Sequence, residues 1–168
     1  MKNYILILLM VVTVMLSGCG EGTEHQKTSG NSLQQSTQDA DVVEKDPDIG
    51  KHKVNVYLFH YSGCGHCREE KAWIASIKDK YSYVNFIMYE VSEYPELFAK
   101  VSQAYDVDNE YVPVTIIGNN YMVGYSETKN RKFIRYFEEL STFESCDVVQ
   151  AVIDGDDVEA CMAKNEIN

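Results

Sequence analysis

The chain has 168 residues, with 26 acidic against 15 basic side chains and a formal net charge of -11 at pH 7. This charge argues against nucleic acid and anionic lipid surfaces as partners, because both repel an acidic protein. Hydrophobic residues make up 45% of the sequence, which is enough for the core of one domain. No internal repeat divides the chain.

The N-terminus has the features of a secretory signal. Lys2 precedes an apolar run over residues 4–16 that is too short for an ordinary membrane-spanning helix. The stretch from Leu16 to Cys19 (LSGC) resembles the lipobox of bacterial lipoproteins, in which the signal is cleaved before a cysteine that carries lipid. The resemblance implies a signal peptide over residues 1–18 and a protein anchored by lipid on Cys19 at the extracytoplasmic face of a membrane. A plain signal peptide with an incidental cysteine is the alternative.

A flexible tether is predicted to follow. Residues 20–50 are dominated by polar and acidic types and glycine, with only scattered aliphatic residues. Such a segment buries too little apolar surface to offset its chain entropy. We therefore assign residues 19–50 to the lipidated cysteine and a tether with a reach of roughly 30 Å. Residues 51–142 are assigned to one folded domain and residues 143–168 to a helical extension.

The first half of the domain predicts a strand, a helix and a second strand. Residues 54–60 and 84–91 are rich in β-branched, aromatic and aliphatic types, which is typical of strands. Between them, apolar residues recur at helical spacing and predict an amphipathic helix over residues 67–81. This order implies a parallel strand pair with a right-handed crossover.

The second half predicts a helix, a hairpin and a last helix. Residues 95–105 begin with a proline suited to a first helical turn. Strands over residues 112–117 and 121–125 flank a Gly-Asn-Asn turn at residues 118–120. An apolar stripe then predicts a third helix over residues 127–141.

Two motifs in this order of elements carry a family resemblance. The sequence CGHC occupies residues 64–67 at the start of the first helix, and Val112-Pro113 opens the third strand. Together they resemble the thioredoxin superfamily over roughly residues 53–141. The resemblance implies an α/β, thioredoxin-like fold with a mixed central sheet and flanking helices, to which residues 143–168 add the predicted C-terminal helical extension. It also implies a cis Pro113 beside the cysteine pair, where the backbone at Val112 offers strand-like hydrogen bonds to a bound peptide.

The chemistry of the CGHC motif explains its place at a helix start. A sulfur there faces unpaired backbone amides and the positive end of the helix dipole, which favour thiolate over thiol. Cys64 is expected to be the accessible nucleophile, and Cys67, one turn inward, the resolving thiol. Gly65 is expected to allow a tight turn, and His66 to present its imidazole near the Cys64 sulfur.

The resemblance implies a thiol-disulfide oxidoreductase that acts on protein thiols without a cofactor, as an oxidase, an isomerase or a specific reductase. Its expected partners are protein substrates and a redox partner at the membrane or outside the cytoplasm. CGHC is also the motif of protein disulfide isomerases, which are more oxidising than thioredoxin. The oligomeric state is left open.

The chain departs from the thioredoxin pattern at two places. Gly63 stands where thioredoxins have tryptophan, and residues 57–59 (YLF) replace the segment that holds their buried acid. The loss of that acid puts proton transfer to Cys67 in doubt. Glu69 and Glu70, in the first helical turn, are expected to oppose a nearby thiolate.

The motif also allows two other functions. His60, Cys64, His66 and Cys67 are potential zinc ligands, but no second Cys-x-x-Cys or His pair follows. No metal is therefore assigned. A thioredoxin-fold lipoprotein that serves as a binding or metal-handling module, without redox turnover, is the alternative function.

Cys146 and Cys161 lie outside the resemblance. They lie on opposite arms of a predicted helical hairpin with a break at residues 154–157. Disulfides persist outside the cytoplasm, and a bridge closing about fifteen residues is worth about 3 kcal/mol in the loop-entropy model. We predict a structural disulfide here, with a second redox pair as the alternative.

Overall fold

The computed structural model describes residues 46–166. The predicted signal peptide, the lipidation of Cys19 and the tether up to residue 45 lie outside the described residues. Within residues 46–166, none of the helices has the length and apolar character needed to cross a bilayer.

The centre of the fold is a four-stranded mixed sheet with the strand order β2-β1-β3-β4. β1 (Val54–His60) pairs in parallel with β2 (Val84–Glu90), as the predicted crossover requires. β3 (Val114–Ile117) runs antiparallel to β1 on one side and to β4 (Asn120–Val123) on the other. β1 is therefore an interior strand, which explains its almost uninterrupted apolar sequence.

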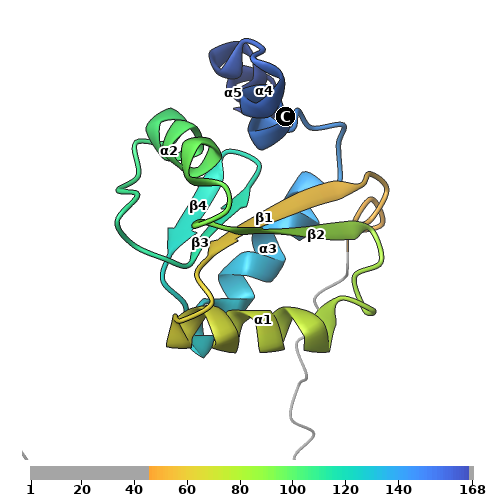
Figure 1. Cartoon of the computed structure of the whole chain (residues 1–168). Coiled ribbons are helices and arrows are strands. Elements are labelled where there is room, and N and C mark those ends of the chain that lie inside the picture. The colour runs from red at the N-terminus through yellow and green to blue at the C-terminus, as the bar shows by residue number, and fades with distance from the viewer. Residues whose placement is uncertain (1–45, 167–168) are drawn as a thin grey trace, which may run out of the picture. The chain divides into compact units, whose positions relative to one another are not determined.

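Helices cover both faces of this sheet (Figure 1). α1 (Gly65–Ile77) and α3 (Asn130–Leu140) pack on one face. α2 (Pro95–Ala104), α4 (Val148–Asp154) and α5 (Val158–Glu166) lie on the other. The predicted α/β fold class is confirmed: the sheet is mixed, helices flank it on both sides, and a helical extension ends the chain.

The alternation of side chains along β1 divides the core into two layers. Val54 and Val56 point into the layer beneath α1 and α3, where Phe137 is fully buried. The alternate residues point into the layer beneath α2, where the rings of Phe59 and Phe98 stack with centroids 5.2 Å apart. Since α1 is fixed on the first layer, its N-terminus stays at the end of β1, where the CGHC motif lies.

Two elements near the motif start at other residues than predicted. α1 begins at Gly65 rather than at residue 67 and ends at Ile77, because Cys64 is its N-cap and the first turn forms directly after it. β3 begins at Val114 rather than at residue 112. Pro113 has no N–H and cannot donate a hydrogen bond to the ladder, so regular pairing starts after it.

The folded part also begins earlier than the predicted boundary at residue 51. Residues 47–50 form turns, and Gly50 N–H donates to Ser141 Oγ at 2.8 Å. Gly50 has a φ of +85°, and a Cβ there would lie 2.9 Å from the ring of Tyr83. Glycine is therefore required at this position. At the other end, the predicted third helix divides into a short 3-10 turn, η1 (Glu127–Lys129), followed by α3.

The C-terminal extension is a helical hairpin that is closed by a disulfide and hydrogen-bonded to β1. Cys146 and Cys161 form a disulfide with Cα atoms 5.3 Å apart. Asp147, the N-cap of α4, accepts hydrogen bonds from the side chains of Asn55 at 2.6 Å and Tyr57 at 2.7 Å. Burial, followed by the effects of Asp147, raises the pKa of Tyr57, so its hydroxyl stays protonated and keeps donating. The hairpin thus covers the sheet face opposite α1.

Candidate active site

The cysteine motif is placed by a tight turn between β1 and α1. After β1 ends at His60, Cys64 N–H donates to the carbonyl of Tyr61 at 3.0 Å. Cys64 has an extended backbone (φ -83°, ψ 125°), and its sulfur accepts the N–H of Cys67 at 3.1 Å. The sulfur therefore takes the position of an N-cap oxygen, where an orphan amide and the helix dipole both stabilise negative charge.

Cys64 and Cys67 form a disulfide with Cα atoms 5.3 Å apart. Their environments differ, since Cys64 is partly exposed while Cys67 is 0% exposed. An incoming sulfur can therefore reach only Cys64, and Cys67 faces the core between α1 and the sheet. This is the asymmetry that an attacking and a resolving thiol require.

The Val112-Pro113 segment lies directly against the cysteine pair. The peptide bond between the two residues is cis. The Val112 carbonyl oxygen is 3.6 Å from the Cys64 sulfur, within reach of an S–H···O hydrogen bond when Cys64 is reduced. Pro113 is buried, and its carbonyl accepts the N–H of Gly124 at 2.7 Å. The segment is thus hydrogen-bonded through Pro113 to the residue after β4, while the Val112 carbonyl faces the reactive sulfur.

Gly65 and His66 differ from expectation. Gly65 lies in regular helix, and a Cβ there would meet only the end of the Arg68 side chain, at 3.9 Å. The predicted need for glycine in a tight turn is therefore wrong, because the turn is complete before residue 65. His66 is exposed, and its Nδ1 lies 3.1 Å from Glu69 Oε2, so the imidazole contacts a carboxylate.

Glu70, which follows Cys67 by three residues in α1, is buried, and this was not predicted from the sequence. Glu69 is exposed, but Glu70 is only 1% exposed. Its Oε1 accepts a 2.5 Å hydrogen bond from Thr115 Oγ1 of β3. Its Oε2 is buried and has no hydrogen-bond partner within residues 46–166. The spacing of Cys67, Glu70 and Ile74 contained the signal, since three residues at i, i+3 and i+7 share one helix face.

The setting of Glu70 changes its proton affinity. Burial raises the pKa of Glu70 from 4.5 to about 7, although the Thr115 hydrogen bond and the charge of Lys129 act in the opposite direction. A carboxyl group in this state exchanges its proton near neutral pH. Because Oε1 is occupied by Thr115, Oε2 is the oxygen available to carry that proton.

The four potential zinc ligands are not gathered around one point. His60 Nδ1 lies 3.3 Å from Glu90 Oε2 and 3.2 Å from Lys71 Nζ, while His66 contacts Glu69. Burial, then the charge of Lys71, lowers the pKa of His60. Among residues 46–166, no three His, Cys, Asp or Glu side chains are grouped so that they could hold a metal ion.

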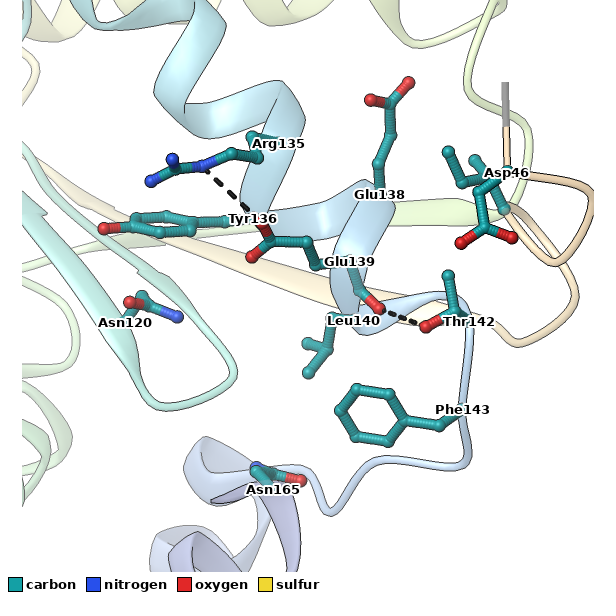
Figure 2. A pocket seen from close by; sticks show the side chains of 11 residues that line it. Asp46, Asn120, Arg135, Tyr136, Glu138, Glu139, Leu140, Thr142, Phe143 and Asn165 are labelled. Carbon is teal, nitrogen blue, oxygen red and sulfur yellow. Dashed lines mark hydrogen bonds and ion pairs between the residues drawn. The ribbon is translucent and has the colours of Figure 1, made fainter. Parts of the chain in front are cut away.

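A separate hollow of about 530 Å³ lies beside the end of α3 and the last turn of α5 (Figure 2). Arg135 Nε is 3.6 Å from Glu139 Oε1 at its edge, and the Thr142 hydroxyl donates to the Glu139 carbonyl at 2.8 Å. Its lining contains no residue of the CGHC motif and no part of the Val112-Pro113 segment. It is therefore not part of the thiol site.

No family model matches the chain, and no curated protein matches it in sequence. Three solved structures are similar. A chain from a study of the thiol-resolving mechanism of a yeast mitochondrial 1-Cys peroxiredoxin is 20% identical, with a TM-score of 0.41 over 52% of this chain and 81% of its own. Oxidised mitochondrial thioredoxin 3 from Saccharomyces cerevisiae is 21% identical, with a TM-score of 0.40 and the same coverage. A glutaredoxin from Archaeoglobus fulgidus is 23% identical, with a TM-score of 0.38 over 51% of this chain and 91% of its own.

Proposed function

We propose that the protein is a thiol-disulfide oxidoreductase that exchanges the Cys64–Cys67 disulfide with cysteines of protein substrates. One observation carries the proposal: a partly exposed sulfur occupies the N-cap of α1, 3.1 Å from the Cys67 N–H, with its bonded partner buried one turn inward. The equilibrium of this pair with glutathione tests it, because a pair that turns over must exchange reversibly.

The proposed reaction begins when a substrate thiolate attacks the Cys64 sulfur. A new bond forms between the substrate and Cys64, the Cys64–Cys67 bond breaks, and Cys67 leaves as a thiolate with the electron pair. A second substrate thiolate then attacks the substrate sulfur of the mixed disulfide, and Cys64 leaves as a thiolate. The substrate is oxidised to a disulfide and the enzyme is reduced to a dithiol. In the reverse direction Cys64 attacks and Cys67 resolves.

The N-cap position favours the oxidising direction. The Cys67 N–H and the helix dipole stabilise a thiolate at Cys64, which makes the reduced enzyme more stable relative to the disulfide. Stabilising the reduced form raises the reduction potential, and about 30 mV corresponds to about 1.4 kcal/mol for a two-electron couple. Because the CGHC motif is also similar to that of protein disulfide isomerases, which are more oxidising than thioredoxin, we propose that the enzyme acts as an oxidase or isomerase.

Glu70 is proposed to exchange a proton with Cys67. Side chains three residues apart on a helix have Cβ atoms about 5–6 Å apart, and both residues are buried on the sheet side of α1. A thiolate released at Cys67 lies in the core, where an unprotonated anion is costly. Glu70 in its acid form can give it a proton, directly or through one water, and take it back when Cys67 must attack. Glu70 of α1 would thus take the role of the buried acid that thioredoxins carry on the strand corresponding to β1.

We also propose that the protein works outside the cytoplasm, held to a membrane by lipid on Cys19 (LSGC, residues 16–19). Replacing Cys19 with Ser is expected to move the protein from the membrane fraction to the soluble fraction, with thiol exchange by residues 46–166 unchanged. Fractionation of cells that express each form, with mass spectrometry of the N-terminus, measures this. A Cys19→Ser protein that remains membrane-bound after signal cleavage would rule out the lipid anchor.

A further inference from the structure

A groove of about 750 Å³ starts at the cysteine motif and runs along the outer side of α1. His66, between the two cysteines, lies at one end of it, and Ser76, near the end of α1, at the other. Its second wall is formed by residues that follow β4, namely Tyr125, Ser126, Glu127 and Asn130. Neither cysteine lines the groove, but His66 places its end two residues from Cys64 in the same motif.

The groove also adjoins the loop that faces the reactive sulfur. Gly124 N–H holds the Pro113 carbonyl at 2.7 Å, and the next residue, Tyr125, forms part of the groove wall. A peptide that is hydrogen-bonded along the Val112-Pro113 segment consequently leaves the active site close to Tyr125. The groove deepens the proposed function and rests on it, because its occupant is a segment of the reacting substrate.

Two aromatic residues line the groove: Trp73, and Tyr125, which is only 7% exposed. Trp73 of α1 packs against Tyr125 with ring centroids 6.1 Å apart and against Phe133 with centroids 5.2 Å apart. Trp73 itself is only partly buried, so ring surface remains on the groove side. Such rings bind the aliphatic stem of a long side chain and attract a cation at its end.

The ionisable groups of the groove are His66, Glu69 and Glu127, and Glu69 Oε2 lies 3.1 Å from His66 Nδ1. Glu69 and Glu127 are exposed carboxylates, and neither lysine nor arginine lines the groove. The Oδ1 atom of Asn130 is buried and has no hydrogen-bond partner in the described part of the chain. The neighbouring Lys129 directs its Nζ to the carbonyls of Val123 and Gly124, at 2.7 Å each, rather than to these acceptors.

We infer that this groove selects substrates that carry a lysine or arginine close to the reacting cysteine. The aliphatic part of a long cationic side chain can pack against the rings of Trp73 and Tyr125. Its positive charge is attracted to Glu127, and its N–H groups can donate to Asn130. The groove follows about ten residues of α1, or about 15 Å. An extended peptide covers about 3.3 Å per residue, so the cation lies within about five residues of the cysteine.

The test uses short peptides with one cysteine that differ only in a residue three positions away, which is lysine, methionine or glutamate. The measured quantity is the rate constant for attack of each peptide thiolate on the Cys64–Cys67 disulfide, divided by the rate with dithiothreitol. Each rate is corrected for the thiolate fraction of the peptide. We expect the lysine peptide to react about fivefold faster than the methionine peptide, with the glutamate peptide slowest.

Two charge-reversal variants distinguish an effect of the groove from an effect of the protein's net charge. Glu127→Lys is expected to bring the lysine-to-methionine ratio to about one. Glu144→Lys changes the net charge equally at an exposed residue outside the groove, and is expected to keep the wild-type ratio. Equal loss in both variants, or a ratio of one in the wild type, would overturn the inference. Failure of the oxidised protein to react with dithiothreitol and with every peptide would instead overturn the proposed function.

Discussion

Replacing Cys67 with Ser is expected to trap the substrate on Cys64 and to abolish turnover. With the resolving thiol gone, Cys64 still attacks a substrate disulfide, but no internal thiol can release the mixed disulfide. Incubation with insulin should therefore give a covalent adduct that is stable without reductant, and reduction of insulin should fall by at least about a hundredfold. Non-reducing electrophoresis and mass spectrometry of the linked peptide measure both effects.

The matched control is Cys64→Ser. This variant keeps only Cys67, which is 0% exposed and lies in the core, so it is expected to form no adduct. Cys67→Ala provides a second trapping variant without a buried hydroxyl. If Cys64→Ser formed the adduct and both Cys67 variants did not, the roles of the two thiols would be the reverse of those proposed.

Replacing Glu70 with Gln is expected to remove a pH-dependent step. In the proposed mechanism, the acid form of wild-type Glu70 protonates the departing Cys67 thiolate. This form is lost as the pH rises through the Glu70 pKa of about 7. The rate constant for attack of a small thiolate on the Cys64–Cys67 disulfide, after correction for the ionisation of the attacking thiol, should therefore fall above neutral pH. In Glu70→Gln the rate should be at least about tenfold lower at pH 6 and flat with pH. Stopped-flow kinetics with dithiothreitol measure this.

The same variant has an expected effect on stability. The folded-state pKa of Glu70 is raised from 4.5 to about 7, so the folded protein holds this proton more tightly than the unfolded chain. Its contribution is fully present below about pH 4.5 and is lost as the pH rises to about 7. This amounts to about 3 kcal/mol. Relative to the wild type, oxidised Glu70→Gln should gain about this much free energy of unfolding between about pH 4 and pH 8.

Urea unfolding at several pH values measures this difference. Glu144→Gln is the control, because residue 144 is exposed and its substitution should leave both pH profiles as in the wild type. If Glu70→Gln followed the wild type in rate and in stability at every pH, Glu70 would have no part in proton transfer.

Much of the framework was predictable because it depends on local patterns. The apolar sequences of β1 and β2 and the amphipathic α1 between them define a parallel unit, and the turn after β3 defines the hairpin with β4. The CGHC motif after β1 then places the cysteine pair at a helix start. Each of these inferences uses residues that are neighbours in sequence, which is why sequence alone sufficed.

The environments of single side chains were less predictable because they depend on distant segments. Glu70 appears as one more charged residue in a polar helix start, but Thr115, forty-five residues later, gives its carboxyl a buried partner. His66 was expected to face Cys64, whereas its imidazole contacts Glu69 one turn along the helix. Gly65 was expected to serve a turn that residues 61–64 complete without it.

The most direct test of the central claim is the equilibrium of the Cys64–Cys67 pair with glutathione. Protein equilibrated at known ratios of reduced to oxidised glutathione is alkylated, and peptide mapping separates this pair from Cys146–Cys161. Because the Cys64 sulfur occupies a helix N-cap and the motif is CGHC, as in protein disulfide isomerases, the account predicts reversible exchange at a potential less negative than that of thioredoxin, about -270 mV. A potential more negative than about -270 mV, or a pair that does not exchange, would contradict it.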